Sequence, residues 1–319
     1  MTLTLAQIQS LRDSYGERLQ VNVSLKRYTA ARIGGNADVM ITVETSDELA
    51  QVIQTLWKYE IPFIILGCGS NVLISDKGVR QVVVLNHAKK IIFNPQSLNP
   101  TVWAESGVNF GALARQAATY GLSGLEWAAG IPGTLGGAIY GNAGAHSSDM
   151  SHCLLMAKIL HHYRETGDAA QEFLQEDWPV ERLEYEYRSS SLKRNPGQAV
   201  ILSAKLKLKQ STPEAVSARM DEYTALRRTS QPSGASLGSI FKNPQGDYAG
   251  RLIEAAGLKG RKVGKVEISQ KHANFFINQD SASAKDYAEL IQLVQKQVLK
   301  EFGLRLELEI EMLGDWTEQ

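Results

Sequence analysis

The amino-acid sequence predicts an α+β protein of two domains that meet near residue 210. The chain has 319 residues, more than one domain of ordinary size holds. Segments with the two-residue period of β-strands alternate along it with segments that have the 3.6-residue period of helices. With 43% apolar and 21% charged residues, the composition is typical of a globular chain that buries a sizeable core.

The first part of the chain combines strands with short helices. Residues 1–13 suit a short amphipathic helix. They lack the basic N-terminal region and the unbroken apolar stretch of a secretory signal. The β-branched run 39–43 predicts a strand, and Thr45 and Glu48 have capping-box spacing at the start of a helix over 46–57. The other elements expected here are strands over 63–66, 72–74, 82–85 and 101–105 and a helix over 110–120 capped by Asn109.

The last part of the chain is also mixed. Thr212 stands before a proline and predicts the start of a helix over 213–229. Ser283 and Asp286 mark the start of a long helix, and the alternation of apolar and charged residues over 305–312 predicts a final strand. The remaining elements expected are a strand over 200–208, a loop over 231–244, a helix over 247–256 and a strand over 274–277.

Charge and cysteine content exclude several classes of function. Lys plus Arg number 34 and Asp plus Glu number 34, so no net positive field would hold a nucleic acid. Cys68 and Cys153 are too few for a disulfide framework or a four-cysteine zinc site, which suits a cytoplasmic protein. The histidines lack the spacing of metal ligands, so we expect no metal. The uncharged stretch 127–148 is too rich in glycine and polar residues to insert in a membrane.

A glycine-containing loop follows the strand expected over 63–66. Glycine there would allow backbone N–H groups to converge on an anion such as a phosphate. The loop is not a Rossmann fingerprint, because a strand rather than a helix follows it. A plain tight turn explains it equally well. Its residues are Gly67, Cys68, Gly69, Ser70 and Asn71.

A second glycine-rich segment covers residues 129–145. A stretch with so few large side chains supplies little core and loses much backbone entropy on ordering. We therefore expect a flat or anionic ligand to approach its backbone, and a dinucleotide with a diphosphate would account for both segments. The alternative is a glycine-rich loop with a purely structural role.

The sequence contains a set of motifs spread along the chain, at residues 29–38, 66–73, 123–137, 142–144, 187–190, 238–244 and 306–314. In these motifs and their order it resembles the UDP-N-acetylenolpyruvoylglucosamine reductase family, in its short form. The resemblance covers nearly the whole chain, which makes chance similarity an inadequate explanation. It implies an FAD-binding domain of vanillyl-alcohol-oxidase type over 1–210, with subdomains of about 1–86 and 87–210, and a C-terminal α+β substrate-binding domain over 211–319.

The family resemblance also implies an activity. Noncovalently bound FAD and the co-substrate NADPH would serve to reduce the enolpyruvyl ether of a UDP-sugar to a lactyl ether. The product would be UDP-N-acetylmuramate, a precursor of peptidoglycan, which connects the protein with cell-wall biogenesis, cell shape and division. We expect a cytoplasmic monomer that binds these small molecules.

Three residues match the family's catalytic positions. Arg188 would stabilise the negative charge that hydride addition places on the substrate carboxylate, and Ser239 would donate the proton. Glu309 matches the family's acidic residue near the C-terminus. Without the resemblance, Arg188 suits a surface arginine, Ser239 a turn before a helix, and Glu309 one member of a solvated charged face shared with Glu307 and Glu311.

The expected ligand-binding residues come from the same motifs. Tyr187, Lys242 and Asn243 are expected to bind substrate. The residues expected to bind FAD are Gly67, Cys68, Gly69, Ser70, Asn71, Gly130, Gly133, Gly136, Gly137, Asn142 and Gly144.

Two alternative functions are left open by the sequence. The first is a flavin oxidase of the same superfamily that acts on an alcohol or sugar. The second is a flavoprotein that only binds nucleotide and regulates wall synthesis.

Overall fold

The computed structural model describes residues 3–163 and 172–317 of the chain. They form two compact units, neither of which is continuous in sequence. The terminal unit contains Met1–Met40, Cys68–Val82 and Arg227–Gln319, and the central unit contains Ile41–Gly67 and Val83–Leu226. The domain boundary near residue 210 stays a prediction.

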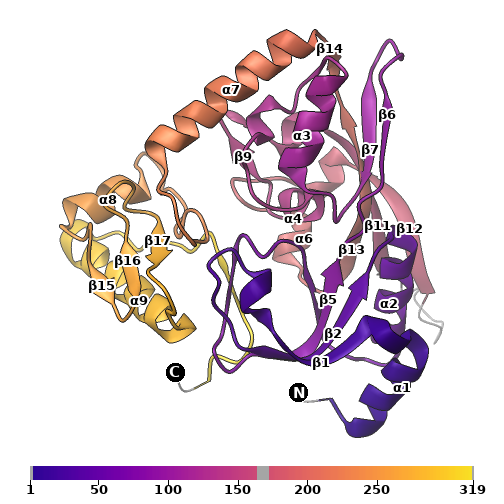
Figure 1. The fold of residues 1–319 in the computed structure, drawn as a ribbon, viewed down its shortest axis with the longest axis horizontal. Coiled ribbons are helices and arrows are strands. Elements are labelled where there is room, and N and C mark those ends of the chain that lie inside the picture. The colour runs from indigo at the N-terminus through magenta and orange to yellow at the C-terminus, as the bar shows by residue number, and fades with distance from the viewer. Residues whose placement is uncertain (1–2, 164–171, 318–319) are drawn as a thin grey trace. The chain divides into compact units, whose positions relative to one another are not determined.

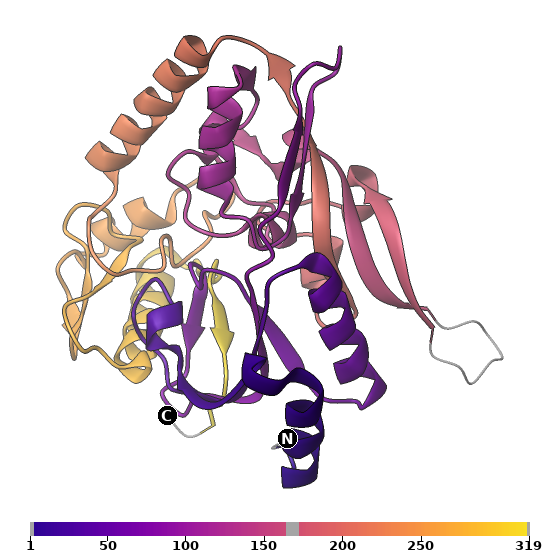
Figure 2. The same cartoon turned by 45° about the vertical axis from the view of Figure 1, so that its right-hand side comes forward.

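The central unit is built on a five-stranded sheet in the order β12-β11-β13-β7-β6, in which all neighbours are antiparallel (Figure 1). Figure 2 shows β11 and β12 running side by side. The strands of this unit are β3 Phe63–Leu66, β6 Ile91–Asn94, β7 Thr101–Glu105, β8 Leu122–Ser123, β9 Gly144–Ala145, β10 Ser148–Asp149, β11 Leu154–Tyr163, β12 Glu172–Pro179, β13 Ala199–Lys207 and β14 Lys209–Gln210. Its helices are α2 Ser46–Lys58, α3 Phe110–Thr119, α4 Leu135–Tyr140, α5 Met150–Cys153 and α6 Ser191–Arg194, with 3₁₀ turns at Glu126–Ala128 and Val180–Leu183.

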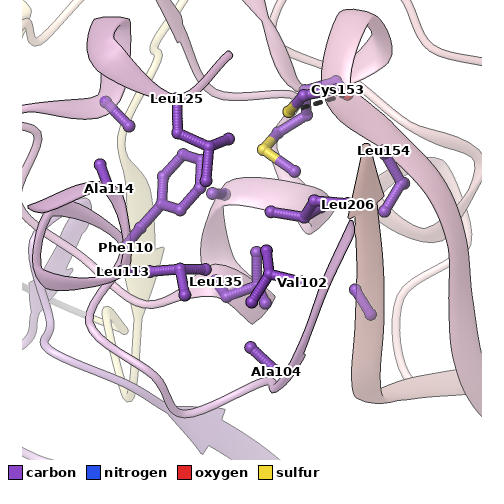
Figure 3. Close-up of a cluster of buried hydrophobic side chains, with 14 of the residues drawn as sticks. Val102, Ala104, Phe110, Leu113, Ala114, Leu125, Leu135, Cys153, Leu154 and Leu206 are labelled. Carbon is purple, nitrogen blue, oxygen red and sulfur yellow. Dashed lines mark hydrogen bonds between the residues drawn. The ribbon is translucent and has the colours of Figure 1, made fainter. Parts of the chain in front are cut away.

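The core of the central unit lies between this sheet and α3, α4 and the segment before α4. Asn109 caps α3 as expected, since its Oδ1 accepts the Ala112 amide at 2.8 Å. Phe110 follows the cap and packs edge-on against Trp127, with ring centroids 5.4 Å apart. Figure 3 shows Phe110 among Leu113, Leu125 and Leu135 in the apolar cluster that fixes α3 and α4 on the sheet.

A buried carboxylate joins three parts of the central unit. Glu105 is 4% exposed, and its two side-chain oxygens accept the amides of Ser46 at 2.8 Å and Lys90 at 2.7 Å. Charge-assisted bonds of this kind are stronger than neutral ones. Glu105 therefore ties the start of α2 and the approach to β6 to the end of β7.

The terminal unit holds residues from both ends of the sequence. Its three-stranded sheet has the order β15-β16-β17, and β18 pairs in parallel with β4. Helices α8 and α9 lie beside β15–β17 in Figure 1 and share one apolar core with them. Its elements are α1 Leu5–Tyr15, α8 Ala249–Ala255, α9 Ala284–Phe302, β1 Leu19–Ser24, β4 Val72–Ile74, β15 Lys262–Val263, β16 Val266–Ile268, β17 Phe276–Asn278 and β18 Glu311–Leu313, with 3₁₀ turns at Gly16–Arg18 and Leu25–Tyr28.

Three elements belong partly to each unit. They are β2 Asn36–Val43, β5 Val79–Asn86 and α7 Pro213–Ser230. Strands β2 and β5 are neighbours in a sheet of order β1-β2-β5-β3.

The final strand expected over 305–312 is wrong in its extent. Only Glu311–Leu313 is a strand, although the alternating pattern begins six residues earlier. Residues 305–310 run beside the segment after Ser239, but they pair through an isolated bridge between Phe241 and Leu308 rather than a continuous ladder. The alternation of apolar and charged residues correctly predicted an extended backbone. A β-strand also requires continuous hydrogen bonding to a neighbouring segment, which the sequence pattern does not reveal.

The glycine-rich segment 129–145 also departs from expectation. It contains helix α4, and Leu135 and Ile139 in that helix are fully buried in the core of the central unit. The expectation that this stretch supplies little core is therefore wrong. Leu135 and Ile139 are four residues apart, so they lie on one face of the short helix and pack together into the core.

Candidate active site

The loop 67–71 uses its glycines to fit its own chain. A Cβ on Gly67 would lie 2.6 Å from Thr134 Oγ1, and a Cβ on Gly69, which has φ +56°, would overlap the Tyr28 carbonyl oxygen. Backbone packing alone therefore requires a glycine at position 69, and its role in cofactor binding stays a prediction. Within the part of the chain that the structure describes, the amides of Gly69 and Ser70 donate to no acceptor. These two N–H groups leave the loop able to bind an anion.

The first three backbone amides of helix α4 donate hydrogen bonds to acceptors within the chain. Leu135 N donates to the Val108 carbonyl at 2.8 Å and Gly136 N to the Ser106 carbonyl at 2.7 Å. Gly137 N donates to the capping hydroxyl of Thr134 at 3.3 Å. A Cβ on Gly136 would be 3.0 Å from both the Cβ and the carbonyl oxygen of Ser106, so this glycine permits close packing. The amide of Gly136 is consequently not available to a phosphate.

Asn142 supplies the clearest sign of a ligand in the central unit. It is 4% exposed and has φ +45°, a conformation that asparagine tolerates better than most residues. Its Nδ2 donates to the Glu186 carbonyl at 3.0 Å, whereas its Oδ1 has no hydrogen-bond partner among the described residues, and neither has Nε1 of Trp127. An unsatisfied buried acceptor is unfavourable unless a donor arrives from outside the chain. The residues present therefore fit a bound group with N–H or O–H donors, as FAD has.

Arg188 lies against the same glycine-rich segment. Its Nη2 donates to the Gly144 carbonyl at 2.9 Å and its Nη1 to the Asn142 carbonyl at 3.5 Å. The guanidinium also lies 5.3 Å from the ring centroid of Tyr187. Arg188 is half-buried and has φ +57°, so its backbone is held in a conformation that few arginines adopt. The central unit thus brings together Asn142, Gly144, Tyr187 and Arg188.

The terminal unit brings Ser239 and Glu309 together. The Glu309 amide donates to the carbonyl of Ile240, the residue after Ser239, at 2.8 Å. The Glu309 carbonyl in turn accepts the side-chain amide of Asn71 at 3.0 Å. Both peptide groups of Glu309 are therefore fixed, one by the serine segment and one by the end of the loop 67–71. Glu309 is half-buried while Glu307 is exposed, so the expected charged face is not uniformly solvated.

Ser239 itself is positioned only through its backbone. It forms an isolated antiparallel bridge with Phe275 and follows Gly238, which has φ +76°. Within the described residues its hydroxyl makes no hydrogen bond. A half-buried hydroxyl without a partner in its own chain is free to contact a substrate.

Lys242 and Asn243 have contacts that the sequence did not predict. Lys242 Nζ lies 3.5 Å from the Glu307 carboxylate, which balances its charge. Asn243 Oδ1 accepts the Ala249 amide at 3.1 Å and so caps α8 in place of its N-cap residue Tyr248. Among the described residues the Nδ2 group of Asn243 donates to no acceptor, and a substrate role for both residues stays a prediction.

The side chains of His161, His162 and His272 contact neighbouring side chains of the protein. His161 and His162 lie on β11: the first contacts the Glu176 carboxylate at 2.8 Å, and the second lies 4.2 Å from the Trp57 ring. Burial lowers the pKa of His272, whose ring packs 4.8 Å from Phe275. No group of three possible metal ligands occurs among residues 3–163 and 172–317. In the same ranges no helix is both long and apolar enough to cross a membrane.

Comparison with protein families accounts for both parts of this arrangement. Residues 37–162 match a family described as FAD binding domain, and residues 230–313 match the UDP-N-acetylenolpyruvoylglucosamine reductase, C-terminal domain. A UDP-N-acetylenolpyruvoylglucosamine reductase from Chloroflexus aggregans is 37% identical over 95% of this chain and 100% of its own length. This chain belongs to the UDP-N-acetylenolpyruvoylglucosamine reductase family.

Other members of the reductase family agree along nearly the full length. The protein of that name from Rubrobacter xylanophilus is 38% identical over 91% of this chain and 94% of its own. The crystal structure of the Thermus caldophilus reductase superposes with a TM-score of 0.74 at 36% identity and covers 92% of this chain and 99% of its own. The predicted fold class, an FAD-binding part of vanillyl-alcohol-oxidase type followed by a C-terminal α+β part, is confirmed.

Proposed function

We propose that this protein reduces the enolpyruvyl ether of UDP-N-acetylglucosamine to UDP-N-acetylmuramate, with NADPH as the hydride donor and FAD as the cofactor. The family membership over 95% of the chain supports the reaction. The observation that carries the assignment of the site is the 2.8 Å bond from the Glu309 amide to the Ile240 carbonyl. It unites an acid and a serine that lie about seventy positions apart in sequence.

When bound, FAD would supply the transfer of hydride from NADPH to the substrate. Addition of hydride to the enolpyruvyl double bond places negative charge beside the substrate carboxylate. We assign stabilisation of that charge to the guanidinium of Arg188, because its planar donors suit a carboxylate and two backbone carbonyls already orient it.

The reduced substrate then needs one proton on carbon. We assign its donation to Ser239, whose hydroxyl makes no bond to the described chain, and we assign Glu309 to the same step as the acid held beside it. A serine is a weak acid, so this role requires a strongly basic substrate carbanion and the exclusion of water.

The residues that would hold FAD come from two places. The loop 67–71 offers the amides of Gly69 and Ser70 to an anion such as the diphosphate. The segment 130–144 offers Oδ1 of Asn142 to a donor on the cofactor. Tyr187, Lys242 and Asn243 remain proposed substrate contacts, and the cytoplasmic location and monomeric state expected from the sequence stay predictions.

Anaerobic stopped-flow absorbance tests the function. We expect purified protein to contain FAD, to lose its flavin absorbance with NADPH, and to recover it when the enolpyruvyl UDP-sugar is added without oxygen. Recovery only on admission of oxygen would contradict the proposal and favour the oxidase alternative. Flavin that stays on the polypeptide after acid precipitation would do the same.

A further inference from the structure

The side chain of Asn274 makes the hydrogen bonds that a neighbouring strand would otherwise make with the segment after Ser239. The Phe241 amide donates to Asn274 Oδ1 at 3.0 Å, and Asn274 Nδ2 donates back to the Phe241 carbonyl at 2.8 Å. One residue earlier, the Ile240 amide donates to the Asn274 backbone carbonyl at 2.9 Å. A single asparagine therefore satisfies three backbone groups directly after the serine.

Asn274 is itself held in one orientation. It is 2% exposed, and both atoms of its side-chain amide are used by Phe241. Rotation of the amide by half a turn would place donor against donor and acceptor against acceptor, which a buried site does not tolerate. The backbone N–H of Asn274 donates to His272 Nδ1 at 3.3 Å, so both the main chain and the side chain of this residue are held by hydrogen bonds.

The opposite edge of the serine segment is bound to the acid segment. The Glu309 amide donates to the Ile240 carbonyl at 2.8 Å, and the Lys242 amide donates to the Glu307 carbonyl at 2.9 Å. The peptide groups after Ser239 thus lie between Asn274 and the chain that carries Glu309. Because the Ser239 hydroxyl makes no bond to the described chain, these backbone hydrogen bonds are what fixes the position of its Cα and Cβ atoms.

We propose that Asn274 is a positioning residue for proton donation by Ser239. It acts through the peptide groups of Ile240 and Phe241 and does not contact the substrate. This inference rests on the proposed function, because it assigns Asn274 to the step in which the enolpyruvyl substrate is reduced and protonated. NADPH oxidation by the flavin involves no proton from Ser239, so the two steps should respond differently.

The decisive variant is Asn274→Asp. It keeps the size of the side chain and the acceptor for the Phe241 amide, but turns a carboxylate oxygen toward the Phe241 carbonyl. A displacement of about 1 Å at a reacting group slows catalysis on the order of 10²-fold. We expect the maximal rate of flavin reoxidation by the enolpyruvyl UDP-sugar to fall by about that factor. The substrate concentration at half-maximal rate, the FAD content and the rate of flavin reduction by NADPH should stay at their wild-type values.

Asn278→Asp is the matched control in the same part of the unit. Asn278 Nδ2 donates to the Ala31 carbonyl at 2.9 Å, and its Oδ1 accepts the amides of Asp280 and Ala282, each at 3.1 Å. The same substitution there should lower the melting temperature and leave the reoxidation rate unchanged. Equal slowing of reoxidation by both variants would show a general structural effect and overturn the proposal.

Two further variants cover other outcomes. The double variant Asn274→Asp with Ser239→Ala should reoxidise no more slowly than Ser239→Ala alone, because both changes remove one function. Asn274→Ser, which keeps one hydroxyl beside Phe241, should lie between wild type and Asn274→Asp. The inference is overturned if Asn274→Asp reoxidises at the wild-type rate, or if neither Asn274 variant folds. A wild-type protein that the enolpyruvyl substrate does not reoxidise would instead overturn the proposed function.

Discussion

The two units hold their candidate site residues in different ways. In the terminal unit, Ser239 and Glu309 are set by a backbone frame whose donors and acceptors are satisfied within the chain. In the central unit, Asn142 and Arg188 stand at positive φ, and a buried acceptor of Asn142 is left without a donor in the described chain. The first arrangement fixes the two groups to which we assign proton transfer, and the second leaves a buried acceptor that a bound cofactor would satisfy.

Ser239→Ala tests the proton-transfer side of this comparison and should have the largest effect. We expect reduction of the flavin by NADPH to be nearly normal and reoxidation by the enolpyruvyl substrate to be slower by about 10² to 10⁴, as is typical of a positioned general acid. That factor corresponds to about 3 to 5 kcal/mol of barrier. Stopped-flow absorbance measures both steps, and equal slowing of the two would assign Ser239 to flavin positioning instead.

Gly136→Ala and Gly137→Ala separate packing glycines from ligand-facing ones in α4. A Cβ at Gly136 meets Ser106 at 3.0 Å, so overpacking should lower the free energy of unfolding by about 1 to 3 kcal/mol. Among the described residues outside its own helix, a Cβ at Gly137 would have Thr134 Oγ1 at 3.5 Å as its nearest neighbour, so the apoprotein should be unchanged or slightly more stable. Urea denaturation of both apoproteins measures the difference. Equal destabilisation would show that Gly137 is also a packing residue.

Asn142→Gly tests whether the unsatisfied acceptor belongs to the cofactor site. Glycine keeps the positive φ without strain and removes Oδ1. We expect the dissociation constant for FAD to rise by about tenfold, which equals about 1.4 kcal/mol. Flavin fluorescence during titration of the apoprotein gives this constant.

Asn22→Gly is the control for Asn142→Gly. Asn22 also has positive φ, at 53°, but it is exposed and accepts a bond from Asn36 Nδ2. FAD affinity should be unaffected in this variant. Similar weakening in both would mean that the loss of an asparagine, and not the buried acceptor, is responsible.

Substitution of the exposed cysteine should have the smallest effect on stability among these predictions. Cys68 is exposed in the loop 67–71, whereas burial raises the pKa of Cys153 to about 12 in the core of the central unit. A thiol reagent should modify one cysteine of the native protein and two after denaturation. Cys68→Ser should abolish the native reaction and change the free energy of unfolding by no more than about 0.5 kcal/mol. Rapid modification of both thiols in the native protein would contradict the described core.

Local sequence patterns predicted the elements that depend on local contacts. Ser283 and Asp286 form the capping box expected at the start of α9, and Asn109 caps α3. At α2 the Thr45 hydroxyl accepts the Glu48 amide as expected, but the Glu48 carboxylate accepts the amide of Glu44 instead of completing the box. Such signals are readable because both partners lie within four residues.

Tertiary contacts explain what the sequence did not predict. Asn274 was expected only as the first residue of a strand, and that strand begins two residues later, at Phe276. The partner of its side chain, Phe241, lies 33 residues away, and no local pattern connects them. The catalytic candidates Ser239 and Glu309 were recognised by family motifs, and their roles stay predictions. Their backbone connection required the structure.

The parallel pairing of β4 with β18 has a consequence for the order of folding. Val72–Ile74 cannot complete its strand pair until the ribosome has added Glu311–Leu313. The central unit, Ile41–Gly67 with Val83–Leu226, is complete in sequence long before that point. Contacts between segments so distant close slowly, because a long loop must be ordered first. On a nascent chain the central unit can therefore form early, while Ser239 and Glu309 can come together only after residues 309–313 have been added.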